Sequence, residues 1–130
     1  MKTDPVSVLG HIQALRSILE ALVEVDEKFL EEHERKSGVP HPSVHDVGAV
    51  LRLEPSSDET FRDIPSIVAL GAGDVADIAC WRIAELRLRG KDASPMIEYR
   101  RGGGYTVKVR IDDEDGVVHI EDPVDIVGRR

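Results

Sequence analysis

The 130-residue sequence has little of several features that would narrow its function at once. It contains a single cysteine, Cys80, so no disulfide can form within the chain. No segment approaches 18 unbroken apolar residues, and the first residues lack the hydrophobic region of a secretory signal. We therefore expect a soluble protein with no membrane partner, made in the cytoplasm and kept there unless an assembly carries it out.

Basic charge is also scarce. The 17 lysine and arginine residues are outnumbered by 25 acidic residues, which gives a formal net charge of -8 at pH 7. Proteins that hold nucleic acids through their phosphates need a basic patch or stripe, and the only local cluster here is Arg100 with Arg101. We therefore predict no nucleic-acid partner.

What is present is ordinary for a globular protein of one-domain length, with 41% hydrophobic and 32% charged residues. Asp4 and Pro5 predict the start of a helix, and apolar residues then recur every three or four positions until about residue 36. This helix is longer than so small a domain needs. We therefore divide the chain into an amphipathic helix, residues 1–38, and an α+β domain, residues 39–130. Either the helix covers the domain's own sheet, or it binds a partner through Leu15, Leu19, Leu22 and Phe29.

The second half of the chain predicts a three-stranded antiparallel meander, and therefore an α+β fold. Strands at 96–101 and 105–111 are joined by three glycines at 102–104, and a third strand at 117–120 follows an acidic turn. Glu121, Asp122 and Pro123 end that strand, and a loop is expected up to Gly128. A short edge strand is expected at 47–53.

Residues 70–89 organise the rest of the chain. Gly71 and Gly73 form a turn, Asp74 stands at the N-cap position, and a helix is predicted from Val75 to a stop at Gly90. Apolar residues fill most of the helix circumference, so the helix should be central and buried. The polar side chains that gather on its one polar side are Asp77, Arg82, Glu85 and Arg89.

One interpretation of the turn is dinucleotide binding. Gly71, Gly73 and Ala76 match the G-x-G-x-x-A pattern, residues 67–70 could be the preceding strand, and Glu98 lies near the place of the ribose-binding acid. Against it, Pro65 shortens that strand, Asp74 adds a negative charge where pyrophosphate would bind, and a hairpin follows instead of further βαβ units. We therefore keep this only as an alternative and predict no cofactor.

A second interpretation is that the turn presented a nucleophile, since a cysteine at a helix start has its thiolate stabilised by the helix dipole. FRDIP at 61–65 and GAGDVADIACWRIAELR at 71–87 resemble the transglutaminase-like cysteine-protein family of phages and phage-derived clusters. That family's run is close to D-I-P followed by G-x-G-D-C-D-D-L-A-x-W-R-x-A-E-L-R. GYTV at 104–107 resembles its Y-H-V, and EDP at 121–123 its E-D-P; the resemblance covers residues 47–128.

The departures from the family pattern fall on the catalytic positions. The family cysteine corresponds to Val75 and the family histidine to Thr106, and only Asp122 keeps the third residue type. Cys80 lies about 140° around the helix from Val75, so we predict a core thiol; activity through Cys80 is an alternative. Strand alternation also places Thr106 with Lys108 on the polar face, so facing the helix would require a bulge or a one-residue shift of the alignment.

His41 and His45 have the spacing of metal ligands on a helix, but Pro40 and Pro42 argue against a helix there, and we predict no metal site. The resemblance implies a transglutaminase-like fold with its nucleophile and base replaced, and therefore no enzyme. We expect a structural or interaction subunit, with other protein subunits as partners, of a phage or phage-derived capsid or tail-like particle. The alternative is a pseudoenzyme that binds a peptide or cell-wall fragment in the former cleft.

Overall fold

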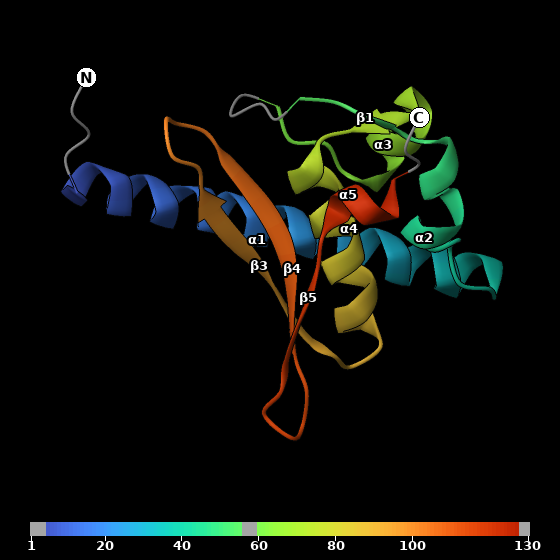
Figure 1. Ribbon diagram of the computed structural model, residues 1–130. Coiled ribbons are helices and arrows are strands. Elements are labelled where there is room, and N and C mark those ends of the chain that lie inside the picture. Colours follow the sequence, from blue (N-terminus) through green and yellow to red (C-terminus); the bar gives the residue numbers. More distant parts are fainter. Residues whose placement is uncertain (1–4, 56–59, 128–130) are drawn as a thin grey trace.

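A long helix crosses the back of a small α+β body in the computed structural model, which describes residues 5–55 and 60–127, with side chains from residue 10 onward (Figure 1). The predicted α+β class is confirmed. The elements in chain order are α1 (Pro5–Ser37), α2 (Val44–Val47), the 3-10 turn η1 (Gly48–Val50), β1 (Arg52–Leu53), α3 (Ile64–Leu70), β2 (Ala72–Gly73), α4 (Val75–Leu88), β3 (Asp92–Tyr99), β4 (Tyr105–Asp112), β5 (Val118–Glu121) and α5 (Pro123–Ile126).

Helix α1 begins with Pro5 and runs for 33 residues, as the sequence predicts. Its apolar stripe packs against α4 and β3 of the same chain. Leu15, Leu19 and Leu22 are therefore buried in the chain's own core, and Phe29 packs against that core, so the prediction that these four residues bind a partner is wrong. The core is continuous across residue 38, because its residues come both from α1 and from the elements after it.

Helix α4 is the central buried helix that the sequence predicts. Asp74 and Asp77 form a capping box at its start, where each side chain accepts a hydrogen bond from the other's backbone N–H. At its end the Gly90 N–H donates to Arg87 O and the Lys91 N–H to Leu86 O, which is the Schellman pattern. Asp77 and Glu85, on the polar side of the helix, are also buried.

The sheet has the order β3-β4-β5 and is antiparallel throughout, which confirms the predicted meander. Strand β3 starts at Asp92, earlier than predicted, because it is an edge strand and can accommodate Pro95. Tyr105, Val107 and Val109 alternate along β4 and point into the core shared with α4.

Two local predictions are wrong. The expected strand at 47–53 is mostly the helical turns α2 and η1, because Ser43 and Asp46 form a capping box that starts a helix. Within this range only β1 forms a strand, and it pairs in parallel with β2. After Pro123 the chain forms α5 instead of a loop, because Asp122 caps that helix; Gly128 lies outside the described residues. Among the described helices, none is both long and apolar enough to span a membrane.

Candidate functional site

The turn into α4 is built from helix signals on both sides. Asp63 caps α3, whose last residues are 67–70, so the strand that dinucleotide binding would need there is a helix. Gly71 then adopts the left-handed conformation, with φ of 73°, and its N–H donates to Ile67 O. Glycine adopts this conformation without the penalty that a Cβ atom brings. Residues 72–73 form β2, which pairs with β1, and Asp74 caps α4.

Carboxylates close the N-terminus of α4. Asp74 Oδ1 accepts from the Asp77 N–H at 2.9 Å, and Asp77 Oδ2 accepts from the Asp74 N–H at 3.0 Å. A Cβ on Gly73 would lie 3.2 Å from Asp77 Cβ, so this glycine permits close packing of an aspartate. A dinucleotide-binding turn instead offers free N–H groups to pyrophosphate after a strand. Here a helix precedes the turn, and negative charge occupies the phosphate position.

Two buried aspartates tie neighbouring segments to this turn. Asp77 Oδ1 accepts from the Arg62 N–H at 2.8 Å, and Asp26 Oδ1, from α1, accepts from the Ile64 N–H at 3.0 Å. Burial raises the pKa of Asp77 to about 6 and that of Asp26 to about 7. The positive charge of Arg62 partly compensates the negative charge of Asp77, since its Nη1 lies 3.9 Å from Asp77 Oδ2 and 2.7 Å from Glu54 Oε2.

Sequence reasoning missed Asp26, although a signal was present. It lies four residues from both Leu22 and Leu30, on the apolar face of α1. An acidic side chain in that position must accept hydrogen bonds, pair with a cation or remain protonated.

The three positions that match the family's catalytic residues lie on α4, β4 and α5, which pack against one another (Figure 1). Val75 is the first residue of α4 and only 7% exposed, so it is part of the packed interior. Asp122 Oδ1 accepts from the Val124 N–H at 3.0 Å and caps α5. Thr106 is 9% exposed in β4.

The strand register decides where Thr106 points. β3 and β4 pair without interruption from Asp92 and Asp112 to Tyr99 and Tyr105, so no bulge turns Thr106. Thr106 therefore shares a sheet face with Glu98, its cross-strand partner, and with Lys108, and this face is opposite to that of the core residue Val107. The register therefore keeps Thr106 on the face that strand alternation predicts.

Cys80 is buried, and its Sγ lies 3.7 Å from Leu19 O. Burial raises the pKa of this thiol well above its usual value, and nearby carboxylates raise it further. Because the thiolate is the nucleophile, a thiol of this kind is unreactive at neutral pH. The prediction of a core thiol is confirmed.

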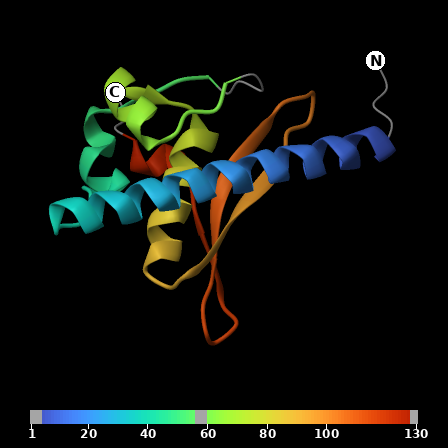
Figure 2. The same ribbon diagram turned by 180° about the vertical axis from the view of Figure 1, so that it is seen from behind.

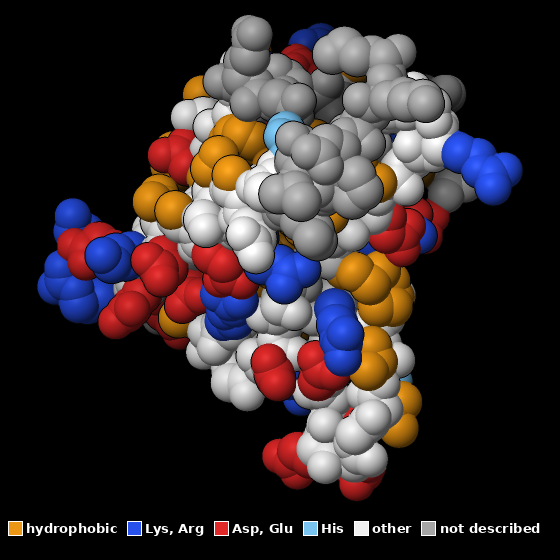
Figure 3. Space-filling view, turned by 90° about the vertical axis from the view of Figure 1, so that its left-hand side faces the viewer, with side chains coloured by type: hydrophobic (Ala, Val, Ile, Leu, Met, Phe, Trp, Pro, Cys, Tyr) orange, Lys and Arg blue, Asp and Glu red, His pale blue; other side chains and the backbone are white. Residues whose placement is uncertain are grey.

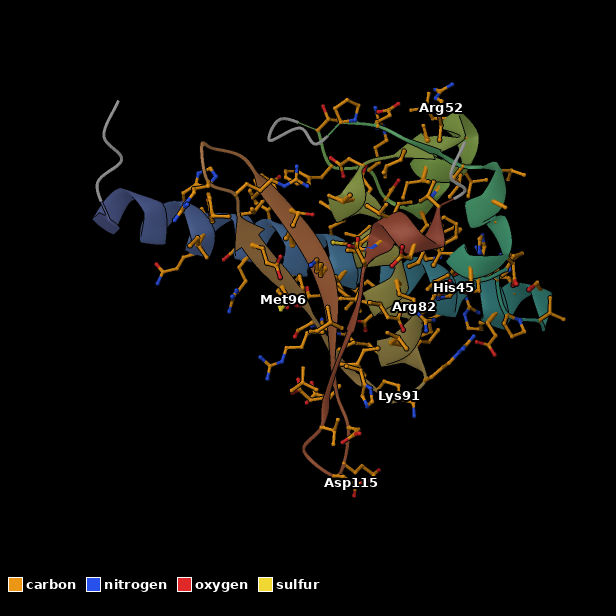
Figure 4. The ribbon with its side chains drawn as sticks, viewed as in Figure 1. His45, Arg52, Arg82, Lys91, Met96 and Asp115 are labelled. Atoms are coloured by element: carbon orange, nitrogen blue, oxygen red, sulfur yellow. The ribbon has the colours of Figure 1, made fainter. Side chains whose placement is uncertain are left out.

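A second polar network joins α2 and β5 to α4, and Figure 4 shows Arg82 and His45 on neighbouring elements. Arg82 Nε lies 2.8 Å from Glu121 Oε1, and its Nη2 lies 3.2 Å from Oε2. Glu85 Oε1 accepts from the Val44 N–H at 2.6 Å, and its Oε2 accepts from the Ser43 hydroxyl. The Arg82 hydrogen bond lowers the pKa of Glu121. These groups hold elements together.

The two histidines with metal-ligand spacing do not converge. The His41 ring lies 5.8 Å from that of Trp81 and 4.9 Å from that of His33, whereas His45 lies 3.8 Å from Glu121. Across residues 5–55 and 60–127, no group of three or more histidine, cysteine or acidic side chains could hold a metal ion. On the face seen in Figure 3, the described acidic and basic side chains are interspersed.

Comparisons with protein-family models, with curated proteins and with solved structures gave no match. The functional conclusion therefore depends on the geometry of the site and on the motif resemblance.

Proposed function

We propose that this chain is a catalytically inactive subunit that acts through protein–protein contacts in a larger assembly. The start of α4 carries the proposal. Val75, which has no ionisable group, is the first residue of α4 and stands where the family motif places its nucleophile.

The remaining catalytic positions support the same proposal. Thr106 lies on the sheet face opposite to the core, and Asp122 caps α5. The thiol of Cys80 is buried deep in the core. The more specific proposal, a subunit of a phage or phage-derived capsid or tail-like particle, depends on the resemblance of residues 71–87 to the family motif.

The subunit proposal is tested by the size of the native material. The isolated chain has a mass of 14.4 kDa. We expect material purified from its source to elute as a much larger complex that contains other chains in a fixed ratio, measured by size exclusion with light scattering and mass spectrometry. A native 14.4 kDa species that binds none of the products of neighbouring genes would overturn the proposal.

The proposed absence of a nucleophile is tested with iodoacetamide. We expect Cys80 to stay unmodified in the folded protein and to react fully in urea. The matched control is Val50→Cys, because the Val50 side chain is 74% exposed and a thiol there should react in the folded state. Modification of Cys80 at the rate of the Val50→Cys thiol would contradict the proposal.

A further inference from the structure

The outer face of α1 carries an apolar stripe that no other part of the described chain covers. Figure 2 shows α1 crossing the near side of the molecule with no ribbon over it. Ala14, Ile18, Ala21 and Val25 are all exposed along this side, Ile18 at 46% and Val25 at 49%. This outer stripe is distinct from the buried face of the helix.

The spacing of the outer stripe is that of a helix–helix contact. Its residues follow one another at intervals of four, three and four, so they lie within an arc of about 60° at 100° per residue. Lys28 and Glu32, the next positions in this pattern, are charged and end the stripe. The apolar part therefore spans about three helical turns.

The order of residues in the outer stripe is complementary to itself when one copy is reversed. Antiparallel to a second copy, Ala14 faces Val25 and Ile18 faces Ala21, and the two-fold axis repeats both layers. Every layer then contains one alanine, which lets the helices approach closely, and one β-branched side chain, which fills the space. A two-fold interface requires such self-complementarity.

Charge favours the same antiparallel orientation. Residues 10–21 contain one basic and one acidic side chain, Arg16 and Glu20, and Glu20 is already paired with Arg87 at 2.8 Å. In the following segment, Glu24 is exposed beside the stripe. In the register that pairs residue 18 with residue 21, Glu24 of one copy lies opposite residue 15 of the other, within residues 11–19, which contain no acidic side chain.

A shallow hollow beside the outer stripe supplies polar complementarity. Gln13, Ser17 and Glu24 are among its lining residues. In the antiparallel register Glu24 of one copy lies opposite the region of Gln13 in the other, so an amide donor meets a carboxylate acceptor. Polar groups at the edge of an apolar contact are typical of interfaces between subunits.

We propose that α1 pairs antiparallel with α1 of a second copy of this chain, through Ala14, Ile18, Ala21 and Val25. This inference rests on the proposed function as a subunit and identifies one of its contacts. Ile18 and Val25 provide the larger apolar areas, so a charge at Ile18 should weaken the pairing most directly.

The pairing is tested by sedimentation equilibrium of the purified chain over a concentration series. We expect a reversible dimer of twice 14.4 kDa, and a dissociation constant at least about tenfold higher for Ile18→Glu. Val50→Glu is the matched control, because Val50 is exposed but lies outside α1, and it should leave the dissociation constant unchanged. A chain that stays monomeric, or equal weakening by both substitutions, would overturn the pairing.

Cysteine crosslinking tests the register. Ala14→Cys mixed with Val25→Cys should form a disulfide-linked dimer, because these positions face each other. Ala14→Cys alone should not, since the two copies of residue 14 are about 16 Å apart along the axis, beyond disulfide reach. Cys80 is buried and does not compete. Self-crosslinking of Ala14→Cys would overturn the antiparallel register.

The two proposals fail in different ways. A monomeric isolated chain found in a large native complex would refute the pairing and leave the subunit proposal intact. A dimer that never associates with other chains would support the pairing and refute the larger assembly.

Discussion

Replacing Asp26 with asparagine should change how the stability of this protein depends on pH. Asp26 is fully buried; its Oδ1 accepts the Ile64 N–H, while Oδ2 has no hydrogen-bond partner among the described residues. Burial raises its pKa from 3.8 to about 7, and the nearby charges of Asp63 and Asp77 raise it as well, against the lowering effect of the Ile64 hydrogen bond. The amide side chain in Asp26→Asn would keep an oxygen acceptor for Ile64 and could not ionise.

The sign of the effect follows from proton binding. Between about pH 4 and pH 7 the folded protein keeps the Asp26 proton that the unfolded chain has released, so the free energy of unfolding falls as pH rises and levels off above about 7. About three pKa units at ~1.4 kcal/mol each give a change on the order of 4 kcal/mol. In Asp26→Asn this contribution disappears, although an unpartnered amide N–H costs ~1–3 kcal/mol at every pH.

Trp81 provides the assay, because it is the single tryptophan and fully buried. Urea unfolding is followed by its fluorescence at pH 5, 6, 7 and 8. From pH 5 to pH 8 the free energy of unfolding of Asp26→Asn should rise relative to that of the wild type by up to ~3 kcal/mol, because these values cover only part of the range from about pH 4 to about pH 7. Asp77, with a pKa of about 6, keeps some slope in both proteins. Asp115→Asn is the exposed control and should follow the wild type. Parallel curves for wild type and Asp26→Asn would refute the reasoning.

Two further substitutions test the packing of the core. In Gly48→Ala the new Cβ would lie 2.2 Å from Ile126 O, so we expect the free energy of unfolding in urea to fall by ~1–3 kcal/mol. In the control Gly10→Ala the new Cβ has no atom within 4 Å, and the free energy of unfolding should rise by ~0.5–1 kcal/mol. Equal values for the two variants would contradict the close contact of η1 with α5. Arg82→Met removes the cation that pairs with the buried Glu85 and with Glu121, and we expect the free energy of unfolding to fall by ~3 kcal/mol. The control Arg110→Met removes an exposed ion pair and should lower it by less than ~0.5 kcal/mol. Equal losses would show that the Arg82 network contributes no more than a surface ion pair.

The sequence predicted the elements whose signals are local and periodic. Helices α1 and α4 and the hairpin follow from apolar spacing, from Asp4 with Pro5, and from Asp74 and Gly90. A similar aspartate–proline signal, at Asp63 and Pro65, starts α3, whereas the dinucleotide interpretation needed a strand in the short apolar run after it. A run of four apolar residues fits a buried strand or a helix equally well, so the cap is the better guide.

The candidate site was predictable only where its partners are close in sequence. The capping box of Asp74 and Asp77 and the burial of Cys80 follow from the helix itself. The roles of Asp26 and Glu85 depend on backbone N–H groups 38 and 41 residues away, at Ile64 and Val44. Helical periodicity assigns a face to each side chain, but it cannot show which distant loop arrives there.

The unbroken pairing of β3 with β4 also limits how this chain can evolve. Position 75 lies at the buried start of α4, while position 106 belongs to the sheet face opposite to the core. A histidine at position 106 would therefore share the sheet face of Glu98 and Lys108. Turning position 106 to the face of Val107 would require a change of backbone register, which flips every neighbouring side chain and disrupts the core.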